Sequence, residues 1–180
     1  MVYVHFAKGF EEIEAVTVMD VLRRGGIETE SVSITGDKTV RGAHGVSVYA
    51  DLLFEEADYG GCEMIVLPGG MPGTKNLLAH DGLISEITSF AENRKYLAAI
   101  CAAPLILGKL NLLIGRKATI YPGMEEDLAG AKACGDIVVK DGNIITSRGP
   151  GTAIEFSLAI VDTLKGKDEA IRLRKALVAI

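Results

Sequence analysis

The residue whose type and surroundings best fit chemistry is Cys101, in the run Ala99-Ile100-Cys101-Ala102-Ala103-Pro104. An apolar strand-like run precedes it and a helix start follows it, so the sulfur is expected at a strand-to-helix turn. Small residues on both sides give the layout of a nucleophile elbow. Free N–H groups at a helix start favour the thiolate and lower the pKa of the thiol. The alternative is a buried structural cysteine, because Cys also packs as a small hydrophobe.

Glu14 is the candidate proton carrier. Its neighbours Glu11 and Glu12 are explained by the preference of acids for a helix N-terminus, but Glu14 lies among apolar residues and would point inward. A buried carboxylic acid resists ionisation. If it faced Cys101, the two groups would share one proton rather than hold two adjacent negative charges.

Two glycine-rich runs follow strand-like segments. Pro68-Gly69-Gly70-Met71-Pro72-Gly73 is either an ordinary turn or a loop whose N–H groups stabilise a reacting oxyanion. It lacks the pattern of a phosphate loop or a dinucleotide fingerprint. Ser147-Arg148-Gly149-Pro150-Gly151 reads as a turn into a helix, where Arg148 would bind carbonyls or an anion.

The histidines and cysteines argue against a metal or a cofactor. His5 falls inside a strand-like run and is expected to be packed with its hydrogen bonds satisfied, whereas His44 and His80 are expected to be solvated. No His-x-x-His spacing and no CxxC pair occurs, so no metal site is predicted. No histidine follows Cys101, which disfavours a protease.

Composition sets the broad class. The chain has 180 residues and a formal net charge of −5, from 19 basic and 24 acidic residues mixed along the sequence, so nucleic acid is not expected as the main partner. No apolar run approaches the ~20 residues of a membrane helix, and the N-terminus lacks the basic start of a secretory signal. We therefore expect a cytoplasmic protein with no membrane partner and one domain over residues 1–180.

The elements that must position these residues alternate between strands and helices. Apolar or alternating runs predict strands. Helices are predicted where an apolar periodic segment has acids at its start and basic residues or glycines at its end. Asp141-Gly142 predicts a hairpin. Thr152-Ala153-Ile154-Glu155 predicts a capping box at a helix start. The pattern indicates an α/β fold with a mostly parallel sheet and helices on both faces, whose sites lie beyond the carboxyl ends of the strands. Strands are expected at 2–7, 27–34, 46–49, 64–67, 96–100, 137–140 and 143–146, and helices from 11 to 24, at 83–92, from 103, at 152–164 and at 168–178.

Four segments, taken in order, resemble the ThiJ/PfpI superfamily and its branch of protein deglycases: 7–14, 66–70, 98–104 and 146–152. The resemblance implies a flavodoxin-like sandwich, related to class I glutamine amidotransferases, that forms a homodimer. It also implies that Cys101 is the reactive cysteine and Glu14 the protonated acid beside it. The N–H groups of Gly69, Gly70 and Ala102 would then face the sulfur.

The family also sets the expected chemistry. It implies a cysteine-dependent glyoxalase or deglycase that acts without a cofactor on methylglyoxal, glyoxal or their early adducts on proteins. The alternatives are a redox sensor or chaperone in which Cys101 is oxidised to sulfinate, and a binding or scaffold protein. Tyr121, Arg148 and Pro150 are candidate lining residues. Relatives carry a histidine where this chain has Tyr121, and tyrosine is a poor base at neutral pH.

Overall fold

The computed structural model describes residues 1–179 and has one central sheet of seven strands, in the order β10-β11-β7-β6-β1-β2-β5. All neighbouring strands are parallel except β10 and β11, which form the antiparallel hairpin that the sequence predicts around Asp141-Gly142. The sheet strands are β1 (Val2–Phe6), β2 (Thr29–Ser33), β5 (Leu52–Leu53), β6 (Met64–Leu67), β7 (Tyr96–Ile100), β10 (Val138–Asp141) and β11 (Ile144–Ser147).

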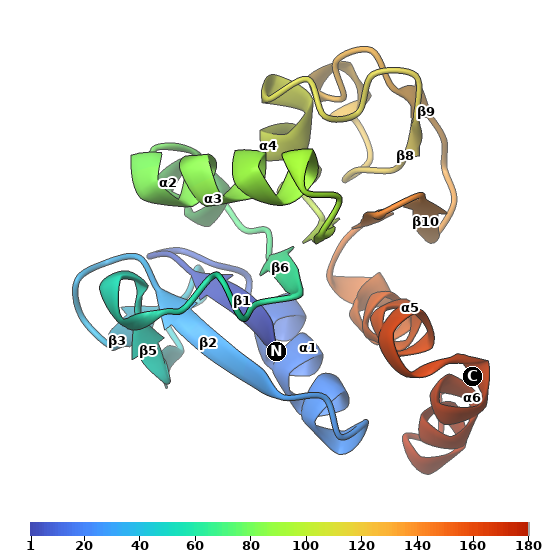
Figure 1. The fold of residues 1–180 in the computed structure, drawn as a ribbon, viewed down its shortest axis with the longest axis horizontal. Coiled ribbons are helices and arrows are strands. Elements are labelled where there is room, and N and C mark those ends of the chain that lie inside the picture. The colour runs from blue at the N-terminus through green and yellow to red at the C-terminus, as the bar shows by residue number, and fades with distance from the viewer. Residues whose placement is uncertain (180) are drawn as a thin grey trace.

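Helices cover both faces of this sheet, as the sequence predicts. One apolar core joins α1, α5 and α6 to one face, and a second joins α2, α3 and α4 to the other. Figure 1 shows α2, α3 and α4 together, on the far side of the molecule from α5 and α6. The helices are α1 (Glu12–Arg24), α2 (Gly73–Leu78), α3 (Asp81–Glu92), α4 (Pro104–Lys109), α5 (Ala153–Lys165) and α6 (Lys167–Ala176).

Successive side chains along each central strand point alternately into one core and the other. In β7, Ala98 and Ile100 belong to the core with α1, whereas Leu97 and Ala99 belong to the core with α3 and α4. Both faces of a parallel sheet are buried in this way, so its strands read as continuous apolar runs rather than as alternating ones. This is why the runs at 64–67 and 96–100 predicted central strands correctly.

Several short strands and turns lie outside the central sheet. A separate hairpin of β3 (Thr39–Arg41) and β4 (Ser47–Tyr49) follows β2, and β8 (Lys117–Ala118) pairs with β9 (Lys132–Ala133). Three 3-10 turns, η1 (Phe54–Glu56), η2 (Glu125–Asp127) and η3 (Pro150–Thr152), complete the elements of residues 1–179. None of the helices in this part of the chain has the length and apolar character needed to cross a membrane.

The predicted capping box at Thr152 is wrong. The Thr152 side chain does not cap α5; its hydroxyl instead donates to the carbonyl of Gly149 and contacts the hydroxyl of Ser147 at 2.7 Å. The 3-10 turn η3 comes between the loop and the helix and directs the hydroxyl back toward the loop. Glu155, the expected partner in the box, forms an ion pair with Arg174 of α6.

Candidate active site

Cys101 lies directly after β7 and just before α4, at the strand-to-helix turn that the sequence predicts. Its φ is 63°, in the left-handed region that a residue with a side chain seldom adopts, and such strain is concentrated at functional sites. Two hydrogen bonds hold this turn: the Cys101 N–H donates to the Ser147 carbonyl, and the Tyr121 N–H donates to the Cys101 carbonyl, both at 2.9 Å. The residue is 9% exposed, so its neighbours cover most of its surface.

Glu14 reaches the same place from α1 and is completely buried. Its Oε2 accepts a hydrogen bond of 2.7 Å from the N–H of Gly69, and its side chain interacts with that of Cys101. Its Oε1 has no hydrogen-bond partner among the described residues. Glu14 therefore has one anchored oxygen and one that is available to a proton.

Gly69 fills the space between these two groups. A Cβ on Gly69 would lie 2.7 Å from the Cβ of Cys101 and 2.9 Å from Oε2 of Glu14, so no other residue fits without a shift. The expectation that the Gly69 N–H faces the sulfur is wrong, because that N–H is directed at Glu14.

The N–H groups of Gly70 and Ala102 each lower the pKa of the Cys101 thiol, as donors near the sulfur would. Gly70 has φ 90°, and a Cβ there would lie 2.6 Å from both the Glu11 nitrogen and the Gly9 oxygen. This close approach and left-handed backbone require glycine. The two donors come from separate loops, so they can hold a charged atom from two directions.

Burial sets the protonation of the pair. It raises the pKa of Glu14 to about 7, against the opposing effects of the Gly69 N–H and Cys101. Burial, then the charge and hydrogen bonding of Glu14, raise the pKa of the Cys101 thiol, while the Ala102 and Gly70 N–H groups lower it. A net lowering by the helix start was expected and is not observed, since α4 is only 6 residues long and Glu14 is adjacent.

These effects favour one proton on the pair. The repulsion from Glu14 acts on the thiolate only when Glu14 is ionised, and it disappears when the carboxyl holds the proton. The pair then carries a single negative charge, either on the carboxylate or on the sulfur.

The three candidate lining residues are placed differently. Tyr121 adjoins Cys101 through its backbone, while its ring lies over Gly149 and is 48% exposed. Arg148 donates to the Gly135 carbonyl at 3.0 Å, which is one of the two roles predicted for it. Pro150 is half-buried at the start of η3. A site role for each of these three side chains stays a prediction.

The histidines depart from their expected environments. His5 is fully buried, as expected, but only Nε2 is paired, at 2.7 Å from the Tyr59 hydroxyl, and Nδ1 has no partner within residues 1–179. His80 is not simply solvated, because its Nδ1 accepts a hydrogen bond from the Leu83 N–H and caps α3. His44 is exposed, yet it contacts Glu11 and Glu12.

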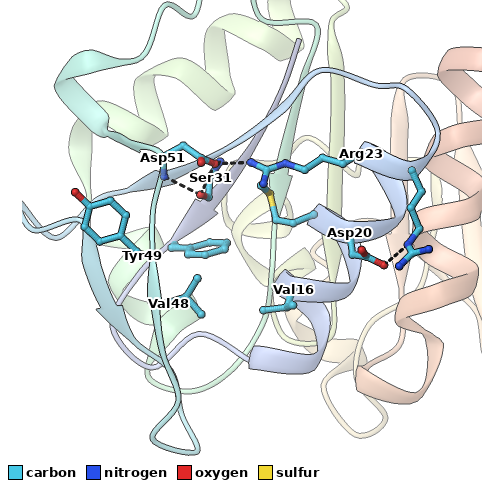
Figure 2. Close-up of a pocket in the computed structure, with 10 residues that line it drawn as sticks. Val16, Asp20, Arg23, Ser31, Val48, Tyr49 and Asp51 are labelled. Carbon is cyan, nitrogen blue, oxygen red and sulfur yellow. Dashed lines mark hydrogen bonds and ion pairs between the residues drawn. The ribbon is translucent and has the colours of Figure 1, made fainter.

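A large hollow on the protein lies away from Cys101. It has a volume of about 560 Å³ and lies between α1, β2 and β4. Figure 2 shows Val16 of α1 across from Val48 of β4, with Tyr49 farther to the left and Arg23 joined to Asp51. Neither Cys101 nor Glu14 lines this hollow, so its size says nothing about the substrate.

Comparisons with known proteins agree with this fold. The model of the DJ-1/PfpI family matches residues 1–163. "Protein DJ-1 homolog B" of Arabidopsis thaliana is 38% identical over 176 residues, which are 97% of this chain. "Glutathione-independent glyoxalase DJR-1.2" of Caenorhabditis elegans is 32% identical over 171 residues, covering 93% of this chain and 89% of that protein. The chain spans only 40% and 46% of the two Arabidopsis relatives, DJ-1 homologs B and A.

Solved structures match over nearly the whole chain. Drosophila melanogaster DJ-1beta has a TM-score of 0.95 at 35% identity and covers 99% of this chain and 97% of its own. "Toxoplasma gondii DJ-1, oxidized" has a TM-score of 0.94 at 35% identity, with coverage of 98% and 97%. Fold and site together define a doubly wound α/β protein with a cysteine at a strand-to-helix turn. The chain belongs to the DJ-1/PfpI family, as its four sequence segments predict.

Proposed function

We propose that this protein is a cysteine-dependent glyoxalase that converts small 2-oxoaldehydes, such as methylglyoxal and glyoxal, to hydroxy acids without glutathione. The observation that carries the proposal is the placement of Glu14 beside Cys101, with the Gly70 and Ala102 N–H groups at the sulfur. These are a nucleophile, a proton carrier and two oxyanion donors in one small space.

The first step forms a carbon–sulfur bond. The Cys101 sulfur attacks the aldehyde carbon, the proton shared with Glu14 moves to the aldehyde oxygen, and a hemithioacetal results. The Gly70 and Ala102 N–H groups stabilise the negative charge that develops on that oxygen.

The second step moves hydrogen along the substrate. Glu14 removes the proton from the former aldehyde carbon to give an enediol, and then returns a proton to the neighbouring carbon. The product is a thioester of the hydroxy acid. Water hydrolyses this thioester and restores the Cys101 thiol, so the sequence needs no external oxidant or reductant. The unpaired Oε1 of Glu14 suits the exchange, because no protein group competes for its proton.

Two further observations favour this assignment. A relative that is 32% identical is named as a glutathione-independent glyoxalase. Cys101 is 9% exposed, and such limited exposure favours a small aldehyde over an adduct on a folded protein. Early glycation adducts remain a second substrate class to be tested. Because the reaction requires a reduced thiol, we place it in the cytoplasm.

The test is proton NMR of methylglyoxal with the purified protein, without glutathione or added metal. We expect lactate with the wild type, and a loss of about 10²-fold or more in Glu14→Gln, which keeps the shape but cannot carry the proton. Cys101→Ser should be inactive. Lactate formation at the buffer rate by the wild type would refute the proposal.

Redox sensing is the second candidate function. A solved relative is described as oxidized, and here the Gly70 and Ala102 N–H groups could hold the oxygens of a sulfinate. Cys62 is an internal control, because it is 1% exposed whereas Cys101 is 9% exposed. Mass spectrometry after graded peroxide should show Cys101 oxidised before Cys62 and Cys134. Equal oxidation of the three thiols would exclude a sensor role.

A further inference from the structure

A cluster of nitrogen and oxygen ligands lies where the β3–β4 hairpin meets the start of α1. The His44 Nδ1 is 2.9 Å from Oε2 of Glu12 and 3.5 Å from Oε2 of Glu11. One ligand atom from each residue lies within 4.8 Å of the others. Ligands around a tetrahedral Zn²⁺ at its usual bond lengths are about 3.4 Å apart, so this spacing needs little adjustment.

Glu11 is the independent sign of a missing ligand. Its side chain is 10% exposed, and its carboxylate accepts no hydrogen bond from any described residue. Its Oε2 forms an ion pair with the His44 ring nitrogen at 3.5 Å, longer than a typical hydrogen bond. An ion bound between these side chains would give the carboxylate a direct ligand bond.

The surrounding backbone holds the other two side chains in place. Oε1 of Glu12 accepts hydrogen bonds from the N–H groups of His44 and Val46, at 2.7 and 3.3 Å. A Cβ on Gly42 would lie 2.3 Å from that oxygen, so the loop fits closely around the carboxylate. Such supporting contacts orient ligands in known metal sites.

We propose that Glu11, Glu12 and His44 bind one divalent transition-metal ion of the Zn²⁺ type. Two carboxylates balance the charge of the ion, and the neutral imidazole supplies a nitrogen ligand that Zn²⁺ accepts. The ion takes the place of the proton between His44 and Glu12 and gives Glu11 a direct ligand bond. The exposed side of His44 leaves a coordination position open to water.

This site was not predicted from the sequence, which gave no metal spacing. Glu12 and His44 are 32 residues apart and meet only because the hairpin folds back on α1. Two backbone hydrogen bonds make this contact, from the Gly9 N–H to the Arg41 carbonyl and from the Ala43 N–H to the Phe10 carbonyl, both at 2.8 Å.

The experiment is calorimetric titration with Zn²⁺ of the full chain carrying Cys101→Ser and Cys134→Ser, which removes competing thiols. We expect one ion per chain, and about 10-fold or more weaker binding in Glu11→Gln and in His44→Gln added to that background. Glu126→Gln, which alters an exposed acid on η2, is the matched control and should bind as the background does.

Weaker Zn²⁺ binding by Glu11→Gln should not result from a loss of folding. The Glu11 side chain makes no hydrogen bond to the described residues, and its one ion pair is with the exposed His44, so Glu11→Gln should unfold close to the background temperature without metal. Zn²⁺ should raise the unfolding temperature of the background protein but not that of Glu11→Gln. Absence of saturable binding in the background, or equal binding in all variants, would overturn the proposal and leave the trio as a structural ion pair.

Discussion

The N–H of Gly69 donates to Oε2 of Glu14 at 2.7 Å, and this bond fixes the acid beside the Cys101 sulfur. It ties the loop after β6 to α1, so two elements far apart in the sequence set the position of one proton. Only glycine fits at position 69, because the Cβ of any other residue would lie under 3 Å from atoms of Cys101 and Glu14.

Gly69→Ala should therefore damage both the fold and the reaction. Forcing a methyl group into this contact is expected to cost about 1–3 kcal/mol of unfolding free energy and to move Glu14 away from the sulfur. Urea unfolding and lactate production measure the two effects. Gly151→Ala is the control, since its added Cβ meets nothing within 4 Å. Equal activity of the two variants would show that Glu14 needs no such anchoring.

The Tyr121 hydroxyl should be dispensable. The Tyr121 ring lies over Gly149, and its hydroxyl has no hydrogen bond to the described residues. Glu14 alone can carry the protons of the proposed reaction. We expect Tyr121→Phe to form lactate within about threefold of the wild-type rate, far from the 10²-fold or greater loss typical of removing an acid–base group. A loss of that larger size would assign the hydroxyl a part in catalysis.

The strand runs and the cysteine turn were predictable because each depends on neighbours in the sequence. Residues 64–67 and 96–100 are apolar throughout, and Cys101 follows the second run directly. Glu14 is buried as predicted, although two of the apolar neighbours that suggested it, Ile13 and Val16, are 57% and 45% exposed.

Contacts between distant segments were not predictable in the same way. The direction of the Gly69 N–H depends on where α1 packs against the loop after β6, and the raised pKa of the Cys101 thiol depends on its own burial and then on Glu14 beside it. The meeting of His44 with Glu12 depends on a hairpin that folds back. Each of these contacts joins two elements that are distant in the sequence, and no local pattern of residue types predicts how those elements pack together.

His5 should make the protein less stable in acid. Burial lowers the pKa of His5 to about 3, whereas an unfolded histidine has a pKa near 6.5. Between these values the unfolded state binds the extra proton, so stability is lost as the pH falls below about 6.5. From pH 7 to pH 5 this residue alone should cost about 2 kcal/mol.

The measurement is urea unfolding of the wild type and His5→Gln at both pH values. The variant lacks the titrating ring, so its stability should fall by about 2 kcal/mol less between pH 7 and pH 5. Its stability at pH 7 is a separate quantity, because Tyr59 also loses its partner. Identical pH dependence in the two proteins would show that His5 can take up a proton while folded.

The apolar surface beside the large hollow should be the contact between two copies of the chain. Val16 of α1 is 45% exposed and lies across the hollow from Val48 of β4, and Tyr49, next to Val48 in the strand, is 73% exposed (Figure 2). Exposed apolar side chains that gather in one patch favour an interface. A homodimer is also what the family resemblance implies.

We expect light scattering to give a dimer for the wild type and a monomer for Val16→Glu, because a carboxylate in an apolar contact is costly to bury. Ile114→Glu is the control, since Ile114 is 64% exposed and does not line the hollow, and it should remain dimeric. A monomeric wild type at micromolar concentration, or a dimeric Val16→Glu, would place this surface outside any interface between copies.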